Sequence, residues 1–316
     1  LIEYYLYFIL EISKNAEHLD ELLTENTRCG FDINKYKFRY TYNDSKGTNS
    51  FKVSPIIHLL HNKKEKDTVD KIKILIKHGI DVTYFDSNTL NNINILSLLL
   101  TNNYSAGEVN ELMTTLVKHG FDINRHKIRY TFTDSKGTKI LFKSSPIIHL
   151  LRNKEEDTVD KIKILVKHGI DVTYEHPLDP NITNIILPLL LDHSAKDIGD
   201  LIPTLIEHGF DINGYTAFLK DKSFYIESPL IGLLESDKSD DLTKIKILIQ
   251  HGIDVLFKDN NFTLGDFLDT PNDLLDTPGD FLDTPYEKMI FHKDKTELLD
   301  CLHDAIVNGS IKFDKT

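Results

Sequence analysis

Tryptophan is absent from this 316-residue sequence, and methionine and cysteine occur only twice each. Cys29 and Cys301 cannot build a disulfide framework, and their wide separation argues against a zinc site. So few cysteines suit a reducing compartment, and we expect an intracellular, cytoplasmic protein. No apolar run approaches the roughly 20 residues that span a bilayer, so we expect no membrane segment. The apolar stretch 1–10 carries Glu3 and has no basic start, which makes it a poor signal peptide.

Positive charge is in deficit, because 37 Lys and Arg residues stand against 49 Asp and Glu residues, for a net charge of -12. This balance disfavours nucleic acid as a partner of the chain as a whole. Hydrophobic residues make up 40% of the chain and charged residues 27%, which is ordinary for a folded protein and argues against wholesale disorder.

Internal repetition is the main feature that the sequence does have. Six glycines each follow an apolar helical pattern and precede an apolar residue, then Asp, then Ile or Val. These glycines are Gly30, Gly79, Gly120, Gly169, Gly209 and Gly252. Two forms, GFDIN and GIDV, alternate strictly at spacings of 49, 41, 49, 40 and 43 residues. The repeating unit is therefore a pair of about 90 residues, present roughly three times.

Each half of this unit predicts two helices. Residues 54–84 and 145–174 are nearly identical, and a weaker copy begins at Ser228. Ser-Pro begins the first helix, because the Ser hydroxyl caps a free N–H and Pro at the first position lacks only a donor that has no helical partner there. Glycine ends the second helix, since it adopts the left-handed conformation without strain.

One apolar stripe marks the second helix of residues 54–84, formed by Val69, Ile72, Leu75 and Ile76. Three lysines are predicted to lie outside this stripe: Lys71, Lys73 and Lys77. The alternate units lack the Ser-Pro start. In one of them Pro203 is predicted to lie near the start of a second helix, where a missing N–H costs little.

The motif Ser-Pro, apolar helix, polar loop and KILIKHGIDV resembles the ankyrin repeat, whose pattern is Thr-Pro-Leu-His-x-Ala followed by a second helix ending in Gly-Ala-Asp-Val-Asn. The resemblance covers about residues 15–316 and recurs in at least five units. The sequence departs from the pattern in three respects: the His lies one position late, Ile or Phe replaces the Ala after Gly, and the units exceed 33 residues.

This resemblance implies a mainly α fold, an α-solenoid of stacked ankyrin-like helix pairs with long β-hairpin fingers in alternate repeats. We expect a single array over residues 1–316. Its units are 1–35 as the N-terminal cap, 54–84, 90–125, 145–175, 183–213, 228–256, and 284–316 as the C-terminal cap.

The extra length of the longer units predicts β-hairpins, because the hydrophobic period there changes from 3.6 to 2. Residues 36–53 and 127–142 alternate aromatic or apolar with polar residues around a turn containing Gly47 or Gly137. Residues 214–227 predict a third hairpin. Residues 37–52 carry a net charge of +3 and residues 127–143 of +4, so both longer fingers are basic within an acidic protein.

The C-terminal part has its own pattern. Residues 265–285 are three tandem heptads, each with Pro, which excludes a coiled coil. We interpret them as an insertion that expanded an ordinary unit. Thr284 and Pro285 are then predicted to begin the last first helix, and four residues to line the last second helix: Leu298, Leu299, Leu302 and Ile306.

Histidine precedes the terminal glycine in five units, at His78, His119, His168, His208 and His251. Equivalent positions in stacked helices lie about 10 Å apart, too far to share a metal whose bonds are about 2 Å long. We interpret these residues as helix-end histidines meeting the helix dipole, and His58 and His149 as structural hydrogen-bonding residues. The sequence shows no nucleophile constellation, phosphate-binding loop or calcium loop, so we expect no catalytic residue, metal or cofactor.

The pattern favours a non-catalytic scaffold for protein–protein interaction, a monomer whose concave or finger face binds a protein or peptide, possibly an acidic one. Aromatic and basic finger residues are the candidate contacts. They are Tyr40, Tyr42, Lys46, Tyr130, Phe132 and Lys136. Two alternatives stay open: a substrate-recognition or targeting arm of a larger enzyme (a ubiquitin-ligase adaptor, or a secreted effector in a host cytosol), and a structural spacer. In the fingers, packing between neighbours and protection of sheet edges are competing interpretations.

Overall fold

A computed structural model describes most of the chain. The described residues are 3–44, 47–62, 67–83, 94–125, 128–133, 139–153, 156–173, 185–213, 216–220, 223–227, 229–234, 238–255, 260–263 and 294–311. The heptads at 265–285, the pair Thr284 and Pro285, and Ser228 lie outside them. The described residues are mainly helical and fall into two compact units, which we describe separately.

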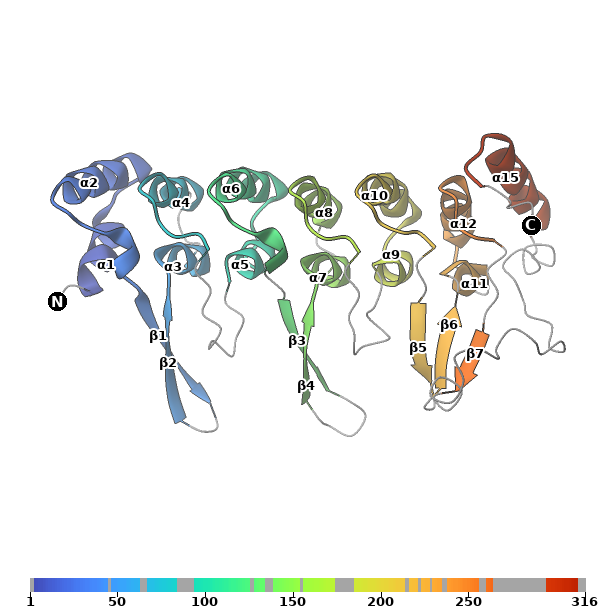
Figure 1. Cartoon of the computed structure of the whole chain (residues 1–316), viewed down its shortest axis with the longest axis horizontal. Coiled ribbons are helices and arrows are strands. Elements are labelled where there is room, and N and C mark those ends of the chain that lie inside the picture. The colour runs from blue at the N-terminus through green and yellow to red at the C-terminus, as the bar shows by residue number, and fades with distance from the viewer. Residues whose placement is uncertain are drawn as a thin grey trace. The chain divides into compact units, whose positions relative to one another are not determined.

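The first unit comprises residues 1–146 and 167–170. It pairs a short with a longer helix and inserts two hairpins (Figure 1). Its elements are α1 (Glu3–Ile12), α2 (Ala16–Arg28), η1 (Ile33–Lys35), β1 (Phe38–Asp44), β2 (Gly47–Val53), α3 (Pro55–His61), α4 (Thr68–Lys77), α5 (Ile95–Thr101), α6 (Ala106–Lys118), η2 (Ile123–Arg125), β3 (Ile128–Thr133) and β4 (Lys139–Ser144).

The second unit comprises residues 147–166 and 171–316. It also pairs short with longer helices, and among its described residues it has one hairpin and one further strand. They are α7 (Pro146–Asn153), α8 (Thr158–Lys167), α9 (Ile186–Asp192), α10 (Ala195–Glu207), β5 (Thr216–Lys220), β6 (Ser223–Glu227), α11 (Pro229–Leu234), α12 (Asp241–Gln250), β7 (Asn260–Thr263) and α15 (Lys295–Val307).

Helices of the same kind pack on one another within each unit. In the first unit α2 contacts α4 and α4 contacts α6, while α3 contacts α5. In the second, α10 contacts α12, α12 contacts α15, and α9 contacts α11. The predicted stripe of α4 is confirmed, because Val69, Ile72, Leu75 and Ile76 are all buried. The core of each unit is thus formed where one helix pair packs against the next.

The predicted hairpins are confirmed in the backbone. β1 pairs antiparallel with β2, β3 with β4, and β5 with β6. A third strand, β7, joins the last hairpin along β6, which the sequence did not indicate. The described residues therefore form two two-stranded sheets and one three-stranded sheet. In Figure 1 both hairpins of the first unit project from the side of the short helices.

The helix ends follow the predicted chemistry. Ser54 caps α3, accepting a hydrogen bond from the Ile57 N–H at 3.4 Å, and Pro55 occupies the first helical position. All six motif glycines have positive φ, between 79° and 92°, and Gly309 adds a seventh at 80°. The αL conformation at these positions explains why glycine recurs just after the second helix of each pair.

Two predictions about helices were wrong. Pro203 lies inside α10 rather than near its start, because a capping box of Ser194 and Asp197 begins this helix upstream. In α15, Leu298 and Leu302 are buried, but Ile306 is 38% exposed and Leu299 is only partly buried. Ala305 fills the core position instead, since 298, 302 and 305 share one helical stripe and 306 is turned away from it.

Candidate functional site

Four of the six predicted contact residues fall on described strands of the first unit. Tyr40 and Tyr42 lie on β1, opposite Phe51 and Asn49, and nothing further is described of their side chains. On β3, Tyr130 lies opposite Phe142 and Phe132 opposite Ile140. Lys46 and Lys136 lie outside the described residues. The backbone thus places the four aromatic residues on the outgoing strands.

The strand register reveals a basic pair that the sequence analysis missed. Arg39 of β1 lies directly opposite Lys52 of β2, and both side chains are exposed. In the backbone register of the second hairpin, Arg129 of β3 lies opposite Lys143 of β4. The alternation of Arg and Lys was visible in the sequence, but the pairing needed the register.

The base of the first hairpin is anchored by aromatic contacts. The Phe38 ring stacks on the His58 imidazole with centroids 4.3 Å apart, and Tyr7 of α1 meets both rings edge-on. Burial lowers the pKa of His58, although nearby Glu11 opposes the shift. Both ring nitrogens of His58 also lie 3.4 Å from the Asn62 Nδ2, so ring contacts and a polar neighbour together support the structural interpretation. The hairpin therefore leaves the helices at a defined place.

Buried lysines form the second polar feature, and here a prediction was wrong. Lys71 was predicted to lie outside the apolar stripe, yet it is only 1% exposed, as is its equivalent Lys161, and Lys244 is 2% exposed. Each pairs with an aspartate four residues earlier: Asp67, Asp157 and Asp240. A buried ammonium is tolerated only with such partners.

One such lysine in each unit also forms a hydrogen bond at the end of the short helix of the preceding helix pair. The Lys71 Nζ donates to the Ser13 carbonyl at 3.2 Å, just after α1, and the Lys244 Nζ donates to the Leu190 carbonyl in α9 at 3.1 Å. The cation thus satisfies a carbonyl at the negative end of the helix dipole. The lysine is excluded from solvent because it joins one helix pair to the next.

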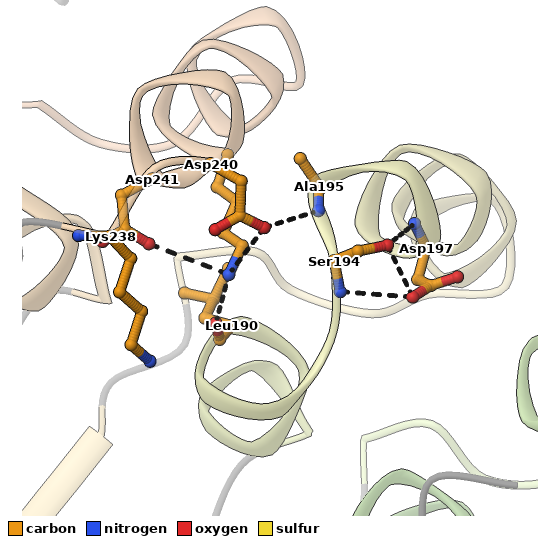
Figure 2. A network of polar contacts seen from close by, with 8 residues as sticks. Leu190, Ser194, Ala195, Asp197, Lys238, Asp240 and Asp241 are labelled. Atoms are coloured by element: carbon orange, nitrogen blue, oxygen red, sulfur yellow. Dashed lines mark hydrogen bonds and ion pairs between the residues drawn. The ribbon is translucent and has the colours of Figure 1, made fainter.

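Figure 2 shows one of these networks, around Asp240. One Asp240 oxygen lies 3.3 Å from the Lys244 Nζ and accepts a hydrogen bond from the Ala195 N–H at 3.1 Å (Figure 2). Burial by itself would raise the pKa of Asp240, but the hydrogen bond and charge of Lys244 and the Ala195 N–H outweigh it and hold the pKa below its usual value. The carboxylate therefore stays ionised while it links α10 to α12.

The asparagine of each GFDIN motif forms hydrogen bonds with the GIDV motif that follows it, which accounts for the alternation of the two forms. We call this set of contacts the asparagine bracket. The Asn34 amide donates to the Gly79 carbonyl at 2.8 Å and accepts from the Asp81 N–H at 2.6 Å. Asn213 makes the same two contacts with Gly252 and Asp254, at 3.2 and 2.5 Å. Asn124 donates to the Gly169 carbonyl at 2.8 Å. The Asn of one motif thus binds the turn of the next.

Removing this bracket should weaken the first unit. Asn34→Ala loses both hydrogen bonds, and we expect the free energy of unfolding to fall by about 1–2 kcal/mol, measured by chemical denaturation. Lys35→Ala, on the neighbouring exposed residue, should change it by no more than about 0.5 kcal/mol. Equal effects of the two substitutions would contradict the assigned role of Asn34.

The helix-end histidines make structural contacts. His119 and His208 each place Nδ1 2.8 Å from the carbonyl oxygen four residues earlier. His78 contacts Asp20 of α2 at 2.6 Å, and His168 contacts Asn110 of α6 at 3.3 Å. Among the described residues, no group of three or more His, Cys, Asp or Glu side chains could hold a metal ion.

Comparison with known proteins adds no assignment. No protein-family model matches the chain, and a search of curated proteins finds no match. None of the described helices is long and apolar enough to cross a membrane.

Proposed function

We propose that this protein is a non-catalytic scaffold that binds a protein or peptide through its hairpins, carried on an ankyrin-type array of helix pairs. One observation carries the proposal: all three hairpins occupy the same place in the repeat. Each lies between a longer second helix and the next short first helix. Hairpins set out at regular steps form a broad, open surface, which suits a protein surface or peptide better than a small reactant that must be shielded from water.

An elongated array should have a larger radius of gyration in solution than a compact protein of the same length. We propose that the helix pairs continue as one monomeric solenoid. A compact globule of this length has a radius of gyration of about 20 Å, whereas seven pairs stacked at about 10 Å intervals should exceed it clearly. Small-angle scattering with light scattering for mass measures both quantities. A monomer with a radius near 20 Å would refute the solenoid.

Charge reversal in the hairpins tests the binding role. The double variant Lys46→Glu with Lys136→Glu should lower the recovery of a partner in affinity capture from lysate, since it removes two cations that would attract and anchor the partner. The matched control is Lys118→Glu with Lys196→Glu, two exposed lysines on α6 and α10. Equal recovery by both double variants and the unaltered chain would refute the hairpin role. Loss in both would indicate a general charge effect.

A further inference from the structure

The first helix pair exposes large apolar side chains. Helices α1 and α2 form the end pair of the first unit, next to α3 and α4 (Figure 1). The end of a repeat array ordinarily presents a polar face to water. Phe8 is nevertheless 56% exposed and Ile12 is 38% exposed, and the two lie one turn apart on α1. Apolar residues gathered on one exposed stripe are typical of a surface that binds a partner.

The repeat gives each residue of this pair an equivalent inside the first unit. The pair α5 and α6 follows α1 and α2 at a distance of 90 residues along the sequence. The helix caps Asn15 and Ser105 keep this spacing, and so do the motif glycines Gly30 and Gly120. The contacts of α5 and α6 with the pair before them therefore show what the same positions of α1 and α2 can bind.

The exposed apolar residues lie on the side that receives a preceding pair. Phe8 corresponds to Leu98, which is only 8% exposed on α5. Ile12 corresponds to Asn102, whose side-chain amide donates to the Leu60 carbonyl of α3 at 2.9 Å. Phe8 and Ile12 thus occupy the positions that α5 turns toward α3. We call this side of the first pair, together with Lys14 and Glu21, its outer face.

Lys14 occupies a position that contacts the end of a preceding short helix. Lys14, Tyr104 and His193 each lie 16 residues before a GFDIN glycine. The Tyr104 hydroxyl donates to the Leu60 carbonyl of α3 at 3.5 Å, and the His193 Nε2 lies 2.8 Å from the Leu151 carbonyl of α7. Lys14 is exposed and carries a cation there. A cation at this position suits the negative end of a helix dipole.

Glu21 extends the outer face onto α2. Its equivalent, Glu111, forms an ion pair with Lys73 of the preceding α4. On α2 the adjacent Asp20 contacts α4, through His78 at 2.6 Å. Glu21 lies about 100° further round the helix and is exposed. It therefore occupies the position that pairs with a lysine of a preceding long helix.

We infer that the outer face of the first helix pair binds a helix pair of a partner protein. The short helix of the partner packs on Phe8 and Ile12 and ends at Lys14, which binds its last carbonyl groups. The longer helix carries a lysine opposite Glu21. The face thus combines an apolar stripe with two charges of opposite sign, and each has an equivalent that makes such a contact or is buried. No hairpin residue takes part, so this inference can fail while the proposed function stands.

A second copy of the chain fits the outer face less well than a different partner. The lysine that α4 contributes to the interior contact is Lys73, six residues before Gly79. On α15, the last helix, the residue six positions before Gly309 is His303. The end of a second copy therefore lacks the lysine that Glu21 would bind.

The test uses the full chain and a synthetic peptide of residues 54–83, which is the helix pair that precedes α5 and α6. The peptide should bind saturably, with a Kd below about 1 mM, and should slow hydrogen exchange in α1. Phe8→Asp with Ile12→Asp should weaken binding at least about tenfold. Val117→Asp, on an exposed apolar residue of α6, should leave it unchanged. Circular dichroism should show that both variants are folded. Equal binding by the double variant and the unaltered chain would overturn the inference.

A charge exchange locates the long helix of the partner. The peptide with Lys73→Glu should bind about fivefold more weakly to the unaltered chain, and Glu21→Lys in the chain should restore its binding. The matched control is Glu207→Lys, the same change on an exposed residue of α10, which should restore nothing. Restoration by neither variant, or by both equally, would overturn the assignment of Glu21.

A covalent form of the test does not require the peptide to fold by itself. Residues 54–93 are placed before Tyr4 in place of residues 1–3, because Tyr4 is the equivalent of Asn94. Hydrogen exchange in α1 should slow at least about tenfold, and Phe8→Asp with Ile12→Asp should reverse the effect. Unchanged exchange in the fused chain would overturn the inference, whether or not the peptide binds.

Two further outcomes would assign the outer face to another occupant. Slower exchange in the fused chain without binding of the free peptide would restrict the face to a covalently attached pair and overturn the inference. Self-association of the full chain, measured by sedimentation and abolished by Phe8→Asp with Ile12→Asp, would identify a second copy as the occupant and overturn it as well.

Discussion

Replacing Lys244 with Met should lower the free energy of unfolding by about 3–5 kcal/mol. The substitution keeps an unbranched side chain of nearly the same length but removes the cation that lies 3.3 Å from Asp240 and 3.7 Å from Asp241. Asp241 is 3% exposed, so its charge would remain buried without a counter-ion. The Leu190 carbonyl would lose its donor as well, which uncouples α9 from α12. Chemical denaturation followed by circular dichroism measures the change.

Lys246→Met is the matched control. Lys246 lies two residues later on α12, and it forms an ion pair with Glu297 at a partly exposed surface. Surface ion pairs contribute about 0–1 kcal/mol to stability. The free energy of unfolding of this variant should therefore remain close to that of the unaltered chain. The same Met substitution at Lys71 tests the first unit, where the ammonium donates to the Ser13 carbonyl. A loss at Lys244 no greater than the loss at Lys246 would show that the buried network is not a structural link.

The buried lysines show where a rule based on hydrophobicity fails. An apolar stripe assigns every lysine of the second helix to the surface, and Lys71 was misplaced for that reason. Burial depended instead on partners that a stripe does not report: an aspartate one turn earlier and a carbonyl from another helix. The recurring spacing of Asp67 and Lys71 in three copies was the available signal.

Local sequence patterns predicted which helices and strands form better than they predicted the residues at which these elements begin and end. Glycine in the αL conformation, the Ser-Pro start and strand alternation each have a local physical cause, and the structure bears them out. Pro203 was misplaced because the start of α10 is set by side-chain capping at Ser194, whereas proline within the helix loses one hydrogen bond that the remaining packing offsets.

The candidate site was only half predictable. Period-2 alternation predicts that strands form and that aromatic residues alternate with basic ones, so the hairpins were found. It does not give the register, because a shift by one residue pairs each residue with a different partner. The opposition of Arg39 and Lys52 emerges only when the backbone partners are known. The added strand β7 depends on a pairing between distant segments and had no local signal.

Gly252→Ala should destabilise the second unit by about 3 kcal/mol, which exceeds the cost of about 1–2 kcal/mol for the left-handed conformation alone. Gly252 has a φ of +83°, and a Cβ there would lie 2.6 Å from the Ser310 carbonyl oxygen. Because that contact is with backbone, relief requires the turn after α15 to move away from the end of α12.

Gly209→Ala isolates this effect. Its φ is +92°, but a Cβ would meet nothing within 4 Å, so only the conformational cost applies. Hydrogen exchange should show faster exchange in α15 for Gly252→Ala and not for Gly209→Ala, together with the larger loss of stability in denaturation. Similar losses in the two variants, with α15 equally protected, would mean that the turn after α15 does not pack against Gly252. The motif glycine would then serve only to end the helix.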